Sequence, residues 1–178
     1  GRFGFGGNVL GATAMLTLDH DANAKDLHRS LRFAPLWRLL CTKGLSRGWK
    51  VVDIEFFDDA SCSNRLRAAV ASILHSRGSS WPSANAFDAN ADTVWKSGCG
   101  LCTDSRCEPC AEREAYIGVR FEQPMMVGCV RLSQGAQGDG GCPEIVLQFS
   151  QSAEAPSWVD RDSFKDLGAF ELLKASTR

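Results

Sequence analysis

An antiparallel β-sandwich is the fold class that this sequence predicts. After residue 35, short apolar runs rich in β-branched and aromatic residues recur, and turn-forming residues bound each run. Within residues 144–150, Ile145, Leu147 and Phe149 occupy every second position, which is the period of a half-buried strand. Short strands separated by turns are typical of sandwiches and barrels, whereas long helical periods are typical of other classes.

The apolar runs predict strands, in chain order, over residues 37–41, 49–57, 116–121, 127–132 and 144–150. Asp58 and Asp59 form a turn signal that closes the second run. Pro124 separates the third and fourth runs, because proline cannot donate to a strand ladder. Residues 63–76 fit either a short helix behind a Ser63 cap or a buried strand over residues 68–74.

The chain divides into three parts by composition. Residues 1–34 form a glycine-rich arm, residues 35–158 form the expected sandwich, and residues 159–178 form a C-terminal tail. A glycine-rich arm has few side chains with which to order itself. We therefore expect the arm and the tail to lie along neighbouring protein subunits.

Charge and hydropathy exclude two classes of partner. Lys and Arg total 20 against 21 Asp and Glu, without a basic stripe, so a nucleic-acid partner is not expected. No stretch approaches the roughly 18 apolar residues of a membrane-spanning helix, so no transmembrane segment is expected. The chain starts at Gly1, so its N-terminus carries no information on targeting.

The segment from Ala86 to Trp95, AFDANADTVW, carries a family resemblance. It resembles the most recognisable motif of discoidin domains, the coagulation factor 5/8 type C family. Residues 116–121, 127–132 and 147–150, with Pro124 and Trp158, follow that family's strand order. Residues 37–57 resemble strands that close the family's domain at its C-terminal end, so the resemblance implies a circular permutation. It also implies a galactose-binding-like jelly roll.

A structural calcium ion is implied by the same resemblance. Asp88, Asn90 and Thr93 match the family's calcium-binding turn, and Asp53 matches an acid on an early strand. Carboxylate, amide, hydroxyl and backbone oxygens are the ligands that calcium prefers. Ala89 replaces the usual glycine of this turn, which strains the loop if the position requires a positive φ. The alternative is that Asp88 and Thr93 only hydrogen-bond the turn.

The cysteines indicate an oxidising compartment, because an even and high number favours paired thiols. We therefore expect the protein to be secreted or to lie in an organelle lumen, such as a thylakoid lumen or an intermembrane space. We expect disulfides among Cys41, Cys62, Cys99, Cys102, Cys107, Cys110, Cys129 and Cys142. The alternatives for the cluster from Cys99 to Cys110 are zinc, for which the spacing is short, and a redox pair within Cys107–Cys110, which Glu108, Glu112 and Glu114 disfavour.

Function is expected to be non-catalytic binding, because no catalytic motif is present. The first hypothesis is an accessory or scaffolding subunit of a larger assembly. The second is a carbohydrate-binding domain, whose expected ligand residues are Arg47, Trp49, Trp81 and Asn85. The third is a thiol-disulfide oxidoreductase.

Overall fold

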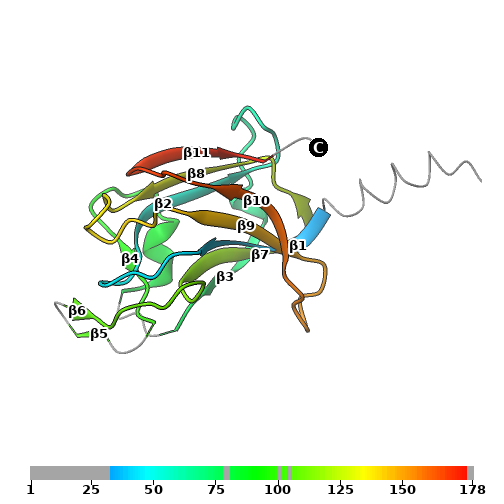
Figure 1. Cartoon of the computed structure of the whole chain (residues 1–178). Coiled ribbons are helices and arrows are strands. Elements are labelled where there is room, and N and C mark those ends of the chain that lie inside the picture. Colours follow the sequence, from blue (N-terminus) through cyan, green and yellow to red (C-terminus); the bar gives the residue numbers. More distant parts are fainter. Residues whose placement is uncertain (1–32, 78–80, 100–101, 104–105, 176–178) are drawn as a thin grey trace, which may run out of the picture. The chain divides into compact units, whose positions relative to one another are not determined.

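Two antiparallel sheets make up the fold, as Figure 1 shows. A computed structural model describes residues 33–77, 81–99, 102–103 and 106–175. The five-stranded sheet has the order β10 (Val159–Phe164), β9 (Ile145–Ser150), β1 (Phe33–Cys41), β7 (Tyr116–Met126), β3 (Val70–His75). The four-stranded sheet has the order β11 (Phe170–Lys174), β8 (Cys129–Gln134), β2 (Lys50–Phe57), β4 (Trp95–Lys96). The prediction of an all-β, antiparallel sandwich is confirmed.

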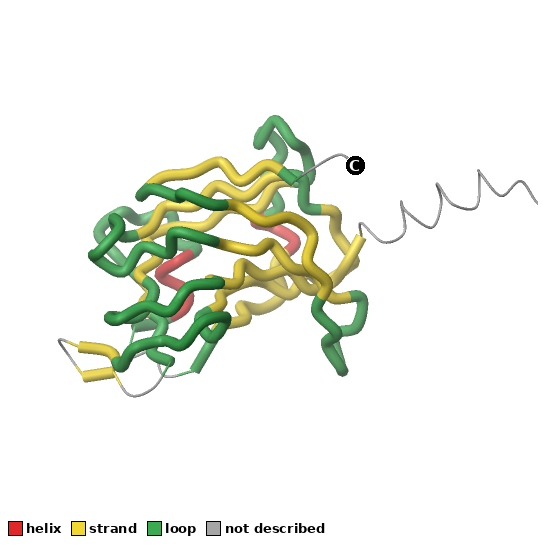
Figure 2. Tube along the Cα trace, viewed as in Figure 1, coloured by secondary structure: helices red, strands yellow, loops and turns green. Residues whose placement is uncertain are grey.

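Helical structure in the described residues is limited to two short 3-10 turns (Figure 2). These are η1 (Arg67–Ala69) and η2 (Ser83–Ala86). A separate two-stranded hairpin pairs β5 (Cys102–Thr103) with β6 (Arg106–Cys107). Turns and loops therefore make most of the connections between strands.

The core lies between the inner faces of the two sheets. Trp37 on β1, Trp49 before β2 and Trp95 on β4 are fully buried, together with aliphatic residues such as Ile117 and Leu132. Along β1, the inward side chains pair with inward side chains of β7 and β9, as in the register of Trp37 with Val119 and Phe149. This alternation is the two-residue period from which the strands were predicted.

The segment 63–76 resolves in favour of the strand. Val70–His75 forms β3 at one edge of the five-stranded sheet, and only Arg67–Ala69 makes a helical turn. Of the two alternatives, the short helix behind Ser63 is therefore wrong beyond this single turn. Ile73 pairs with Val119 of β7, which places it on the inner face although it is only partly buried.

Pro124 does not separate two strands, because β7 continues through it to Met126. The register of β7 with β1 shifts between Ala34 and Leu36, so Pro124 lies in an irregular part of the ladder. A proline is tolerated there because no ladder N–H is needed.

The structure corrects the expectation that residues 159–178 form a tail outside the sandwich. Residues 159–164 and 170–174 form β10 and β11, and each of these strands is the edge of one sheet. The sandwich therefore includes residues that composition assigned to the tail. Most of the expected N-terminal arm, residues 1–32, lies outside the described residues, so the expectation for it stays a prediction.

Candidate functional site

The turn from Asp88 to Thr93 is built from its own polar side chains. The Asp88 carboxylate accepts the Asn90 N–H at 2.9 Å and the Thr93 hydroxyl at 2.7 Å. The Asn90 amide oxygen in turn accepts the Asp92 N–H at 3.1 Å. The Thr93 hydroxyl and the Asn90 N–H hold the pKa of Asp88 below its usual value, so this carboxylate is ionised at neutral pH.

Ala89 occupies the left-handed region, with a φ of 60°. This backbone conformation costs a residue with a Cβ on the order of 1 kcal/mol, and glycine adopts it freely. The position therefore has a positive φ, which is the condition under which we expected Ala89 to strain the loop. The strained turn aims the Ala89 N–H at the carboxylate of Asp53 on β2.

Asp53 brings a second carboxylate to this turn. Its Oδ1 is buried and has no hydrogen-bond partner among the described residues. Burial, followed by the nearby carboxylate of Glu55, raises the pKa of Asp53, and Asp88 adds to the repulsion. An orphaned carboxylate oxygen beside a second carboxylate is stabilised by a cation.

The structure thus brings together the residues expected to hold calcium: Asp53, Asp88, Asn90 and Thr93. Their donor set of carboxylate, amide and hydroxyl oxygens suits a hard cation, and the orphaned Asp53 Oδ1 fits such an ion. Among the described residues, no group of three or more His, Cys, Asp and Glu side chains could hold a metal ion. The carboxylates of the expected calcium ligands are those of Asp53 on β2 and Asp88 in the turn, and bound calcium would neutralise their charge.

Trp49 is not available to a ligand. Its side chain is 0% exposed, its Nε1 donates to Gln134 Oε1 at 2.8 Å, and its ring packs edge-on against Trp95. The expectation that Trp49 stacks on a sugar is therefore wrong. A buried indole with a satisfied N–H is a core residue.

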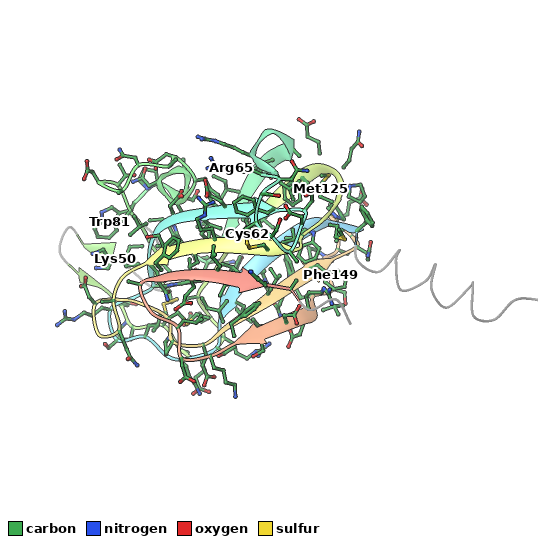
Figure 3. The ribbon with its side chains drawn as sticks, turned by 90° about the horizontal axis from the view of Figure 1, so that it is seen from above. Lys50, Cys62, Arg65, Trp81, Met125 and Phe149 are labelled. Atoms are coloured by element: carbon green, nitrogen blue, oxygen red, sulfur yellow. A yellow bond between two sulfur atoms is a disulfide. The ribbon has the colours of Figure 1, made fainter. Side chains whose placement is uncertain are left out.

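The other three expected ligand residues have different environments. Asn85 donates from Nδ2 to the Val94 carbonyl at 2.9 Å and so fastens the turn before β4. Lys96 lies over the partly buried Trp81 ring at 5.5 Å from its centroid. Arg47 is exposed and lines a polar cavity of about 200 Å³ between residues 44–48 and 137–143. Lys96 pairs in turn with Lys50 across the ladder of β2 and β4, and Figure 3 labels both Trp81 and Lys50.

Six of the expected cysteines form three disulfides, which pair Cys41 with Cys142, Cys62 with Cys129, and Cys99 with Cys110. A sulfur in a disulfide is not a thiolate, so Cys99 and Cys110 are unsuited to zinc in this state. Cys110 is bonded to Cys99, so it is not closed with Cys107 as a redox pair. The side chains of Cys102 and Cys107 lie outside the described residues, although their backbones are cross-strand partners. Three disulfides indicate an oxidising, non-cytosolic environment.

A buried ion cluster on β2 was not predicted from the sequence. Glu55 is 6% exposed, and its two carboxylate oxygens contact Arg65 and Arg131, the latter at 2.6 Å. Arg131 also lies over the Phe57 ring at 5.1 Å from its centroid. Glu55 lies two residues after Asp53 on the same strand face, which was visible in the sequence, but its arginine partners were not.

A second unpredicted cluster covers the outer face of the five-stranded sheet. The Arg38 guanidinium lies 3.9 Å from the Trp158 ring centroid and 4.7 Å from that of Tyr116. Its Nε donates to Gln148 at 2.7 Å, and Gln148 donates to Asp160. This stack fastens the loop before β10 to the sheet, which explains why Gln148 is buried on a face that should meet solvent.

The fold and these clusters define a disulfide-linked antiparallel β-sandwich. No family model matches the chain, and neither a curated protein nor a solved structure matches it. Among the described residues, no helix is both long enough and apolar enough to cross a membrane.

Proposed function

We propose that this chain is a non-catalytic binding module that serves as an accessory or scaffolding subunit of a larger protein assembly. The observation that carries the proposal is an exposed apolar pair on β11. Phe170 is 60% exposed and Leu172 is 46% exposed, although both belong to a strand of the sandwich. Exposed aromatic and aliphatic residues that lie together are typical of protein interfaces.

The register of β11 explains why these side chains face outward. Phe170 pairs with Ser133 and Leu172 pairs with Arg131 on β8, whereas Leu173 pairs with the buried Val130. Because paired residues of an antiparallel ladder share a face, Phe170 and Leu172 lie on the outer face of the four-stranded sheet. β11 is also the edge of that sheet among the described strands, so the exposed apolar pair lies beside a strand edge.

If a partner binds this surface, we expect the double variant Phe170→Ser, Leu172→Ser to leave the assembly. We expect the tagged wild-type chain to elute from a native extract well above its own 19.3 kDa, and the double variant to elute near that mass. The matched control is Val159→Ser, which removes a 49% exposed side chain from β10 at the edge of the other sheet. A wild-type chain that elutes as a monomer, or a double variant that stays in the assembly, contradicts the proposal.

The discoidin resemblance belongs to the same proposal. Its support is the turn from Asp88 to Trp95, in which the aspartate and threonine of the motif are hydrogen-bonded to each other and the tryptophan is fully buried. A permuted galactose-binding-like module would act in a secretory pathway or in an organelle lumen, such as a thylakoid lumen or an intermembrane space.

Carbohydrate binding is the second candidate function, and the cavity beside Arg47 favours it. Glycine backbone from two loops lines this cavity together with the exposed Arg47 guanidinium, so it offers both donors and acceptors to hydroxyl groups. Binding on a glycan array that Arg47→Ala removes would support this candidate over the assembly subunit.

We further propose a structural calcium ion at Asp53, Asp88, Asn90 and Thr93, and Asp53→Asn tests it by a change of sign. Burial raises the folded-state pKa of Asp53, so the folded chain loses stability as the pH rises from the unfolded pKa through the folded one. In EDTA at pH 7 we therefore expect the asparagine variant to melt at or above the wild-type temperature.

With excess calcium the order reverses. The wild type gains about 2.7 kcal/mol when calcium is at a hundred times its Kd, and the variant gains little. Thermal unfolding followed by tryptophan fluorescence measures both arms. Asp92→Asn is the matched control, because it removes an exposed carboxylate from the same turn. If the melting temperature of the wild type is the same in EDTA and in excess calcium, the proposed ion is ruled out.

A further inference from the structure

A second cavity opens where the two sheets part, between β2 and β3. Its volume is about 200 Å³, and its apolar lining comes from both sheets and from the segments that connect them: Ile54, Phe56, Leu66, Val70, Ile73 and Phe87. β2 loses its strand neighbour here, because β4 pairs only with Lys50 and Val51. The Leu66 N–H instead bonds the Phe56 carbonyl at 2.8 Å and holds the cavity wall in place.

The size of this cavity fits one ring. An apolar cavity of about 150 Å³ in a protein interior is large enough to bind benzene. A cavity of about 200 Å³ has room for a six-membered ring and a short substituent. Because Ile73 and Val70 are only partly buried, a ligand can reach the lining from solvent.

The charged side chains that line this cavity are Arg65, Arg67 and Glu55, two positive charges against one negative charge. Outside the lining, Asp53 interacts electrostatically with Arg65, and Asp88 with Arg67. The Glu55 carboxylate already contacts two guanidinium groups, those of Arg65 and Arg131, so it has little capacity left for a cationic ligand. Each guanidinium carries five N–H donors, so the two arginines together can serve an incoming acceptor as well. Figure 3 shows Arg65 beside β2 on the side away from β11.

We propose that this cavity binds a small aromatic carboxylate, with its ring between Ile54, Val70 and Ile73 and its carboxylate toward Arg65 and Arg67. The ring would exchange water contact for apolar lining, and the carboxylate would stay at the arginine-bearing rim. Such a division, an apolar body with a few placed polar groups, is the usual chemistry of small-molecule sites.

This site is independent of protein docking on β11. β11 and the cavity lie at opposite edges of the four-stranded sheet, in the order β11, β8, β2, β4. A variant that loses ligand binding in the cavity can therefore still be tested for partner binding on β11, and the reverse also holds.

Phenylacetate, with benzylamine as its cationic counterpart, tests the site. In amide NMR spectra of the whole chain, we expect phenylacetate to shift the signals of Leu66, Val70 and Ile73 in a saturable way. Benzylamine should leave these signals in place, because its charge matches that of the arginines. Absence of a saturable shift with phenylacetate, or equal binding of benzylamine, overturns the proposal.

Two variants separate the ring from the carboxylate. Ile73→Trp fills the cavity and should abolish the phenylacetate shifts, and Arg67→Glu should weaken binding by about tenfold or more. Arg77→Glu is the matched control, because it reverses an exposed charge just after β3 and outside the lining. If Ile73→Trp does not fold, the Arg67 and Arg77 variants decide alone. Equal affinity in these two variants overturns the proposal.

Discussion

Replacement of both Cys41 and Cys142 by serine is expected to lower the free energy of unfolding by about 4 to 5 kcal/mol. The bond joins the end of β1 to the loop before β9 across a sequence separation of 101 residues. Closing a loop of this length removes much of the conformational entropy of the unfolded chain. Both sulfurs are also fully buried, so each serine would place a hydroxyl in the core.

The matched control is the double serine variant of Cys99 and Cys110, whose separation is only 11 residues. The same loop-entropy argument gives about 3 kcal/mol for this shorter loop. Urea unfolding followed by tryptophan fluorescence measures both variants. Equal losses, or a larger loss in the control, would show that loop entropy is not the source of the stabilisation.

Gly118→Ala is expected to cost about 3 kcal/mol or more, since overpacking in a well-packed site costs about 1 to 3 kcal/mol and here the obstacle is backbone. Gly118 lies opposite Arg38 in the ladder between β7 and β1. An added Cβ would lie 2.1 Å from the Trp37 carbonyl oxygen and 2.5 Å from the Arg38 Cα. Neither atom can move unless the central strands separate.

Gly168→Ala provides the comparison for this substitution. Its Cβ would meet only the flexible Glu171 carboxylate, at 3.4 Å, so we expect a change within about 0.5 kcal/mol. The loss of free energy is again read from urea unfolding. Similar losses at the two glycines would mean that the close approach of β1 and β7 is not what requires glycine.

The sequence predicted the strands whose two faces differ in polarity or whose residues are β-branched. β2 and β9 were predicted within one residue of their bounds, because both strands are bounded by turn residues. The edge strands β10 and β11 were missed. β10 reads Val-Asp-Arg-Asp-Ser-Phe and β11 exposes Phe170 and Leu172, so neither shows the apolar alternation of a half-buried strand.

The turn of the candidate site was predictable because its residues are close in sequence, whereas Asp53 was assigned to it only through the family resemblance. Asp88, Asn90 and Thr93 belong to one turn, and the motif located them together. Contacts made across the fold have no local signal. Nothing near Trp49 indicated its hydrogen bond to Gln134, and nothing near Glu55 indicated that Arg131 would reach it.

Side-chain footprinting of the native assembly tests the proposed β11 interface most directly. Hydroxyl radicals oxidise exposed side chains, so Phe170 and Leu172 should react in the isolated chain and be protected in the assembly. Val159 on β10 should react equally in both. Protection confined to the two β11 side chains is the predicted result. Equal oxidation of Phe170 and Leu172 in both states would contradict a partner on this surface.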